Sequence, residues 1–116
     1  KSDLLRGWAV QLLCEDREPS AVALARFAEM AEKDTPWVRL KLASALQRLP
    51  VDQRWPIATA LVAHEEDNDD HNLPLMIWYG VEPAVAANKA QALKLAAACK
   101  LSKVRQFIAK RISEGG

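Results

Sequence analysis

The chain has 116 residues, is half hydrophobic and carries a formal net charge of +1, which fits one domain and excludes two independent hydrophobic cores. No apolar run approaches the roughly eighteen residues of a membrane-spanning helix, so we expect no membrane span. The chain begins Lys-Ser-Asp, without an initiator methionine or a signal-peptide pattern, and ends Glu-Gly-Gly. We therefore expect residues 1–116 to be a single domain excised from a larger protein, and a monomer in isolation.

Apolar residues recur at helical spacing and no alternating β-branched stretch persists, which predicts an all-α fold. Thr35 precedes a proline at a first helical position, and Asn88 is followed by Gln91, so both residues are expected to cap helices. Pro83 is expected to end the fifth helix. We expect about seven helices, over approximately residues 3–14, 19–32, 36–49, 53–65, 73–82, 89–99 and 101–113.

An apolar-Arg pair recurs along the chain, at Leu5-Arg6, Val38-Arg39 and Val104-Arg105. The interval from Arg39 to Arg105 is twice the interval from Arg6 to Arg39, and we call the shorter one the repeat interval. A further copy fits between the second and third pairs if Pro74 matches Pro36, with Ile77 in the place of the arginine. Each copy falls on the second helix of a predicted pair.

This pattern resembles the HEAT-like repeat, which implies a right-handed α-solenoid of stacked antiparallel helical hairpins. In such repeats an acidic residue near the preceding turn commonly faces the arginine. Asp34 before Arg39 and Asp3 before Arg6 fit that arrangement, whereas the third arginine has only Ser102 nearby. The patterns of tetratricopeptide and ankyrin repeats, which have similar periods, are missing.

Residues 72–112, beginning NLPLMIWYG, resemble the helical segment of large secreted bacterial redox proteins. In those proteins a sugar-dehydrogenase-like propeller, HEAT-like repeats and a c-type cytochrome follow one another. The resemblance implies a scaffold between domains and a periplasmic or secreted location. The residues alone do not indicate the location. The chain contains no Cys-x-x-Cys-His haem site.

Two histidines, His64 and His71, flank five acidic side chains. A zinc-binding helix would need its second histidine four residues after the first, where this chain has Asn68. A calcium loop would need a glycine for its sharp turn, and none is near. We expect no metal, and a solvated acidic turn in which Asp70 or Asn72 caps the next helix.

Cys14 and Cys99 lie on the first and sixth predicted helices, too far apart in a linear stack for a disulfide, so both are expected to be free and buried. No nucleophile-base set is suggested by spacing, and there is no glycine-rich phosphate loop. We therefore predict a protein without catalytic residues, cofactor or small-molecule substrate.

The predicted helix over 73–82 is apolar almost all round and needs cover on more than one side. We expect Met76, Trp78 or Tyr79 to contact an adjacent domain of the same protein or another protein, with Gly80 allowing that surface to approach closely. The alternative is that Trp78 is core and flanking helices cover the rest. The other tryptophans are expected in the core or at hairpin joins: Trp8, Trp37 and Trp55.

Charge is distributed unevenly along the chain. Residues 1–88 contain nine Lys/Arg and fourteen Asp/Glu, whereas residues 89–116 contain seven and one. A solvated terminal helix explains this split, and the alternative is a nucleic-acid-binding repeat in which Lys103, Arg105, Lys110 and Arg111 contact phosphates. We favour the docking function because the acidic turn would repel a nucleic-acid backbone.

Overall fold

The computed structural model describes residues 6, 7, 9 and 21–114, and these are helical or form short connections, with no strand among them. The all-α prediction is thus confirmed for this part of the chain. Residues 6, 7 and 9 are helical and belong to the predicted helix over 3–14, most of which lies outside the described residues. The α-helices are α2 (Ala21–Lys33), α3 (Pro36–Ala45), α4 (Trp55–Leu61), α5 (Leu73–Ala87), α6 (Lys89–Ala98) and α7 (Ser102–Glu114), and the 3-10 helices are η1 (Leu46–Arg48), η2 (Val51–Gln53) and η3 (Glu65–Asp69).

Two predicted caps are present and explain where α3 and α6 begin. The Thr35 hydroxyl accepts a hydrogen bond from the backbone N–H of Val38 at 3.3 Å. The side-chain oxygen of Asn88 accepts one from the N–H of Gln91 at 3.1 Å. Each satisfies a donor that the first turn of a helix leaves unpaired.

The predicted end of the fifth helix at Pro83 is wrong, because α5 continues to Ala87. A proline inside a helix removes one backbone hydrogen bond and disfavours the turn before it. In α5 the residues on either side of the proline, Val81, Ala84 and Val85, are all buried. Packing therefore stabilises the helix across a residue that local propensity treats as a break.

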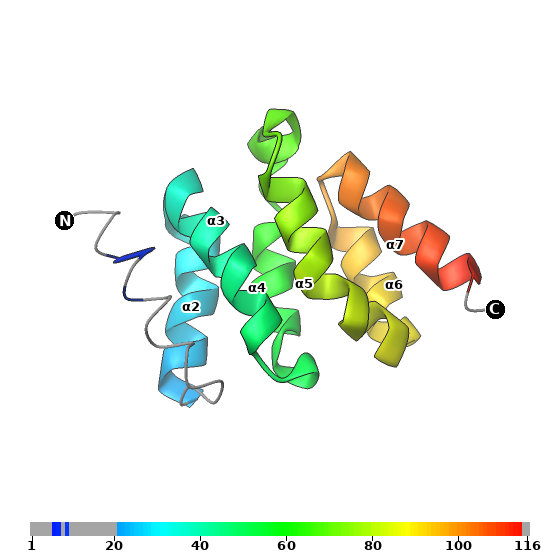
Figure 1. Cartoon of the computed structure of the whole chain (residues 1–116), viewed down its shortest axis with the longest axis horizontal. Coiled ribbons are helices and arrows are strands. Elements are labelled where there is room, and N and C mark those ends of the chain that lie inside the picture. Colours follow the sequence, from blue (N-terminus) through cyan, green and yellow to red (C-terminus); the bar gives the residue numbers. More distant parts are fainter. Residues whose placement is uncertain (1–5, 8, 10–20, 115–116) are drawn as a thin grey trace.

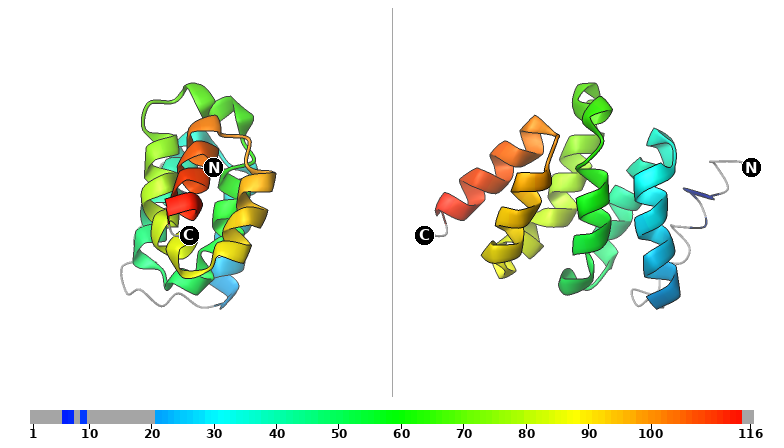
Figure 2. Two further views of the ribbon diagram at one scale, coloured as in Figure 1. Left: turned by 90° about the vertical axis from the view of Figure 1, so that its right-hand side faces the viewer. Right: turned by 180° about the vertical axis from the view of Figure 1, so that it is seen from behind.

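The helices form two layers, with α2, α4 and α6 in one and α3, α5 and α7 in the other (Figure 1). Within each layer a helix packs against the helix two places along the chain, and the connecting turns join the layers. Figure 2 shows the α2, α4 and α6 layer from behind, with α2 and α7 toward opposite ends of the long axis. No helix of the described segments is long and apolar enough to cross a membrane.

A continuous core lies between the layers and repeats from one hairpin to the next. Val38 and Leu42 of α3 are buried, and so are Val104 and Ile108 at the corresponding positions of α7, two repeat intervals later. Helix α5 packs against α3, α4, α6 and α7, which explains why nearly its whole circumference is apolar.

Gly80 lies where α5 closely approaches the end of α3 and the start of η1. A Cβ atom at this position would lie 2.6 Å from Cβ of Leu46 and 3.3 Å from the carbonyl oxygen of Ala43. The expectation that Gly80 serves the approach of an external partner is therefore corrected, because the close neighbour is α3 of the same chain.

Candidate functional site

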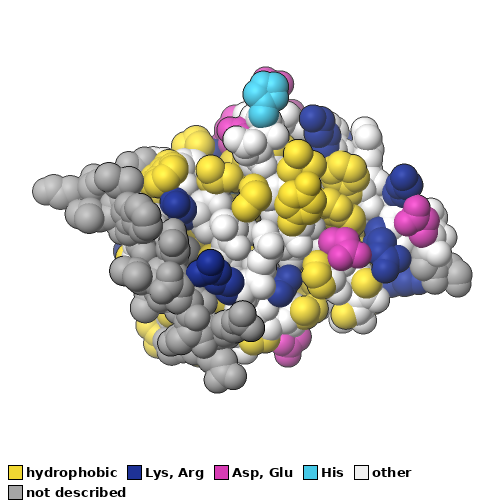
Figure 3. All heavy atoms as spheres, in the orientation of Figure 1, with side chains coloured by type: hydrophobic (Ala, Val, Ile, Leu, Met, Phe, Trp, Pro, Cys, Tyr) yellow, Lys and Arg dark blue, Asp and Glu magenta, His cyan; other side chains and the backbone are white. Residues whose placement is uncertain are grey.

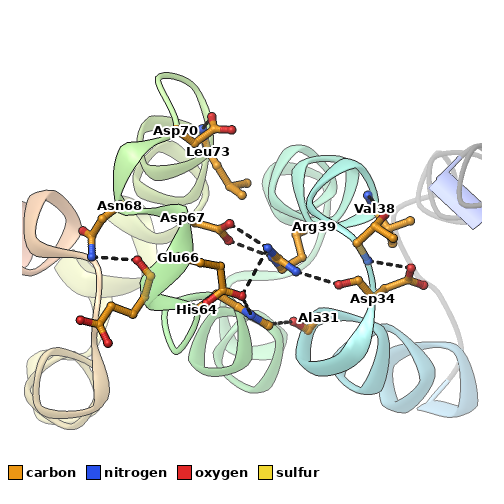
Figure 4. Close-up of polar contacts among 12 residues, drawn as sticks. Ala31, Asp34, Val38, Arg39, His64, Glu66, Asp67, Asn68, Asp70 and Leu73 are labelled. Atoms are coloured by element: carbon orange, nitrogen blue, oxygen red, sulfur yellow. Dashed lines mark hydrogen bonds and ion pairs between the residues drawn. The ribbon is translucent and has the colours of Figure 1, made fainter.

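Two ion pairs, one partly buried and one fully buried, join neighbouring helix pairs along one edge of the molecule. Nε and Nη2 of Arg6 each donate to a carboxylate oxygen of Asp34 at 2.6 Å. Nε and Nη2 of Arg39 donate to Asp67 at 2.8 and 2.7 Å (Figure 4). In both pairs the aspartate follows the arginine by 28 residues, so each arginine is bound bidentately by the turn of the next hairpin.

The sequence placed Asp34 opposite Arg39, and the structure connects these residues differently. Nη1 of Arg39 donates to the backbone carbonyl of Asp34 at 2.7 Å, while the Asp34 carboxylate binds Arg6. The Arg6 guanidinium, helped by the N–H of Thr35, lowers the pKa of Asp34 below its usual value in spite of partial burial. In both bidentate pairs the carboxylate thus comes from the turn that follows the arginine. The preceding turn supplies Arg39 with a carbonyl.

The acidic turn at η3 is not uniformly solvated, which corrects the sequence-based expectation. Asp67 is 4 % exposed and buried against Arg39, whereas Glu65, Glu66 and Asp69 face solvent. Asp70 caps α5 as predicted, with Oδ1 accepting the backbone N–H groups of Asn72 and Leu73 at 2.8 Å. These two hydrogen bonds lower the pKa of Asp70.

His64 and Asn68 also connect neighbouring hairpins. Nε2 of His64 lies 2.7 Å from the carbonyl oxygen of Ala31, and Nδ1 lies 2.9 Å from the Glu66 carboxylate. The Asn68 side chain donates to the carbonyl of Lys100 at 2.8 Å and accepts the N–H of Ser102 at 2.9 Å.

The two histidines do not come together on a metal-binding face. His71 is exposed at the turn before α5, away from the contacts of His64. Within the described part of the chain no three His, Cys, Asp or Glu side chains are placed to hold a metal ion.

The sequence analysis missed the role of Asp67 as the buried partner of Arg39. It could have been found, since the repeat interval that separates Arg6 from Arg39 also separates Asp34 from Asp67.

An apolar groove of about 350 Å³ lies between α3 and the N-terminal half of α5. Tyr79 is 56 % exposed at this groove and Leu75 is 37 % exposed. Apolar side chains gather over the middle of this face of the molecule, with basic side chains around them (Figure 3). The groove is lined by Trp37, Leu40, Lys41, Ser44, Asn72, Leu75, Met76 and Tyr79.

Of the three predicted contact residues, two line this groove and the third, which is partly buried, packs against α7. Met76 and Tyr79 line the groove. Trp78 is absent from it, and its ring stacks on Phe107 of α7 with centroids 5.4 Å apart. Ile77 is fully buried. Trp78 therefore joins α5 to α7, and only Met76 and Tyr79 face the groove.

Lys41 is the one charged side chain among the residues that line the groove. Lys41 Nζ lies 4.7 Å from the ring centroid of Trp37, close enough for a cation-π interaction. Helices α3, α5 and α7 together contain six Lys/Arg and two Asp/Glu. A ligand that combines apolar side chains with carboxylates would match this face.

The four basic residues proposed for anion binding do not form one row. Lys103 and Lys110 are separated by two helical turns and lie on one face of α7, whereas Arg105 is two residues from Lys103 and therefore points about 200° around the helix. Arg111 pairs with Glu82 at 3.0 Å. The structure thus does not bring these four side chains together against a single phosphate backbone.

Cys99 is buried and free, as predicted, and its thiol donates to the carbonyl of Leu101 at 3.2 Å. Burial raises the pKa of the Cys99 thiol, which disfavours the nucleophilic thiolate. Cys14, the other predicted free thiol, lies outside the described residues.

Comparison with known proteins finds no match to this chain among protein-family models, curated proteins or solved structures.

Proposed function

We propose that the chain is a HEAT-like α-solenoid segment that acts as a non-catalytic scaffold and docking module in a larger bacterial protein. The equal spacing of Arg6 from Arg39 and of Asp34 from Asp67, together with the two-layer packing, supports repeated helical hairpins. The bidentate ion pairs between hairpins, of which Arg39–Asp67 is fully buried, suit a rigid spacer, because each hairpin is fixed to the next by directional bonds.

The observation that carries the docking role is the apolar groove between α3 and α5. Tyr79 and Leu75 are large and exposed there, beside Met76 and Trp37. Water contact with such a surface is unfavourable, and aromatic side chains in a groove supply much of the energy of protein interfaces. The partner we assign is an adjacent domain that inserts an apolar segment bearing carboxylates near Lys41.

The likeness of residues 72–112 to the helical segment of secreted bacterial redox proteins suggests the parent. In a multidomain dehydrogenase or cytochrome c protein of the periplasm or outside the cell, this module would hold a redox domain in place. Its own residues would supply no electron-transfer group, because the sequence contains no haem attachment motif.

Nucleic-acid binding is the less favoured function. Arg111 is paired with Glu82, and Arg105 points away from Lys103 and Lys110. The exposed carboxylates of η3 would also repel a phosphate backbone. Salt-dependent binding of random DNA or RNA by the isolated chain would support the alternative over the docking role.

Hydroxyl-radical footprinting tests the docking role without requiring the partner to be known. Met76 and Tyr79 should react less in the intact parent polypeptide than in the isolated chain, because the adjacent domain covers them. Val22 of α2 is 80 % exposed, outside the groove, and serves as the internal control. Equal labelling of Tyr79 in both proteins would contradict the proposal.

Replacing Leu75 by Ala should then restore part of the reactivity of Tyr79 in the parent, since one contact of the docked segment is lost. The matched variant Leu93→Ala removes the same atoms outside the groove and should leave Tyr79 protected.

A further inference from the structure

Helix α7 repeats the pattern of α3 two repeat intervals later along the chain, in its exposed positions as well as its core. Arg39, Ala43 and Leu46 follow one another along one side of α3 and the turn after it, and Arg105, Ala109 and Ile112 stand at the corresponding positions of α7. We call this set of three positions the stripe. In both copies it contains an arginine, an alanine and a large aliphatic residue.

The stripe of α3 is covered by the next hairpin. Arg39, Ala43 and Leu46 are buried, with Asp67 on the guanidinium and Gly80 of α5 against the other two residues. The alanine and the glycine allow the two helices to approach closely. This contact shows what kind of surface fits a stripe of this composition.

The stripe of α7 has no such cover within the described chain. Arg105 and Ala109 are exposed, and Ile112 is only partly buried. Leu93, 58 % exposed, lies on α6 of the same terminal hairpin. The terminal hairpin therefore presents to solvent the same side-chain types that α3 buries.

Arg105, like Arg39, donates a hydrogen bond from Nη1 to a backbone carbonyl just before its own helix. Nη1 of Arg39 donates to the carbonyl of Asp34, five residues earlier, and Nη1 of Arg105 donates to the carbonyl of Cys99, six residues earlier, at 3.4 Å. The remaining edge of Arg39, Nε and Nη2, takes both oxygens of Asp67. No acceptor among the described residues faces the corresponding edge of Arg105.

We propose that the α7 stripe is a docking surface for a further helical hairpin, built like α4–η3–α5. The turn of that hairpin carries an aspartate that binds Arg105 bidentately, and its second helix places a small residue over Ala109. The guanidinium and the carboxylate are complementary in charge and in their planar two-bond geometry.

The occupant we assign belongs to the same polypeptide as α7. Both ion pairs of this kind are formed within one chain, with 28 residues between arginine and aspartate. A second copy of the described residues is the poorer occupant, because its turn aspartates, Asp34 and Asp67, are already bound by Arg6 and Arg39.

An extended protein provides the test, in which residues 1–112 are followed by a copy of residues 47–87. The copied aspartate then follows Arg105 by 28 residues, as Asp67 follows Arg39. We expect the added hairpin to resist limited proteolysis at least about tenfold longer than an unfolded tail, since cleavage follows the population of the undocked state.

Arg105→Gln and Asn at the copied aspartate should each abolish most of that protection, and the two together should have little further effect. Lys103→Gln, on the same helix but facing elsewhere, is the matched control and should preserve the protection. Digestion of the added hairpin at the rate of an unfolded tail, or equal protection in the Arg105→Gln variant, would overturn the proposal.

Sedimentation of the unextended chain addresses the competing occupant. A dimer that is lost in an Ala109→Arg variant would assign the stripe to a second copy and so overturn the proposal as stated. None of these results depends on the groove between α3 and α5, so failure here and failure of the proposed docking function would be distinguishable.

Discussion

The Arg39–Asp67 pair offers the sharpest test of the forces that hold neighbouring hairpins together. Both side chains are 4 % exposed, and two hydrogen bonds of 2.8 and 2.7 Å join them. Asp67→Asn keeps the shape of the side chain but removes its charge, leaving the buried guanidinium only the exposed Glu66 carboxylate, 3.7 Å from Nη2, as an anion. We expect a loss of about 3–5 kcal/mol in the free energy of unfolding, the usual cost of removing one partner from a buried ion pair.

This loss in the free energy of unfolding comes mainly from leaving a buried charge without its partner, so it exceeds the net stabilisation that the ion pair provides. Replacing both residues by apolar ones of similar volume, Arg39→Met with Asp67→Leu, removes the charge and its partner together. The double variant should therefore be more stable than Asp67→Asn alone, although the carbonyl of Asp34 loses the Arg39 donor.

Urea unfolding followed by circular dichroism measures these differences, with Glu29→Gln as control. Glu29 pairs with Arg26 at 3.5 Å, and both side chains are more than half exposed, so its removal should cost less than about 0.5 kcal/mol. If Asp67→Asn cost no more than this control, the pair would not be a determinant of hairpin stacking.

Four further substitutions test other parts of the fold. Trp78→Ala should cost about 2–3 kcal/mol, at or below the low end for a core aromatic because Trp78 is only partly buried, whereas Tyr79→Ala, 56 % exposed, should barely change urea stability. Gly80→Ala should lower the free energy of unfolding by about 1–3 kcal/mol, and with it the melting temperature, because the added Cβ would lie 2.6 Å from Cβ of Leu46. No loss of stability would show that Leu46 can shift to make room for the added methyl group. The pKa of Asp34 is lowered in the folded state, so its contribution is present above the unfolded value near 4 and lost as pH falls through the folded value. Asp34→Asn should accordingly flatten the fall of stability in acid, and an unchanged pH profile would contradict that assignment.

Helix positions could be predicted from the sequence where local chemistry determines them. Thr35 and Asn88 cap helices because their side chains bind backbone donors only three residues away. The end of α5 could not be predicted in this way, since burial of Val81, Ala84 and Val85 outweighs the local preference of Pro83. Tertiary packing decides such cases, and a single sequence does not reveal it.

The ion pairs show the same limit at longer range. The sequence identified Arg6, Arg39 and Asp34 as repeat positions, but it placed the Asp34 carboxylate opposite Arg39. Asp3, the acid placed opposite Arg6, lies outside the described residues. The observed partners are 28 residues away because the stacking of hairpins brings each second helix against the next turn. For the groove, the apolar composition of α5 indicated a contact surface, and only the packing of Trp78 on Phe107 separates this partly buried aromatic from the exposed Tyr79.

Buried polar contacts explain how layers of small apolar side chains keep one register. Arg54 is buried with no carboxylate partner among the described residues, and it donates instead to the carbonyls of Leu49 at 3.0 Å and Gly80 at 2.8 Å. A slip of α5 by one turn would preserve much apolar contact, but it would move Gly80 away from Arg54 and leave a buried guanidinium short of acceptors, which is costly. We infer that Arg54 and the Arg39–Asp67 pair select the register in which α3 and α5 meet, and with it the shape of the groove beside Tyr79.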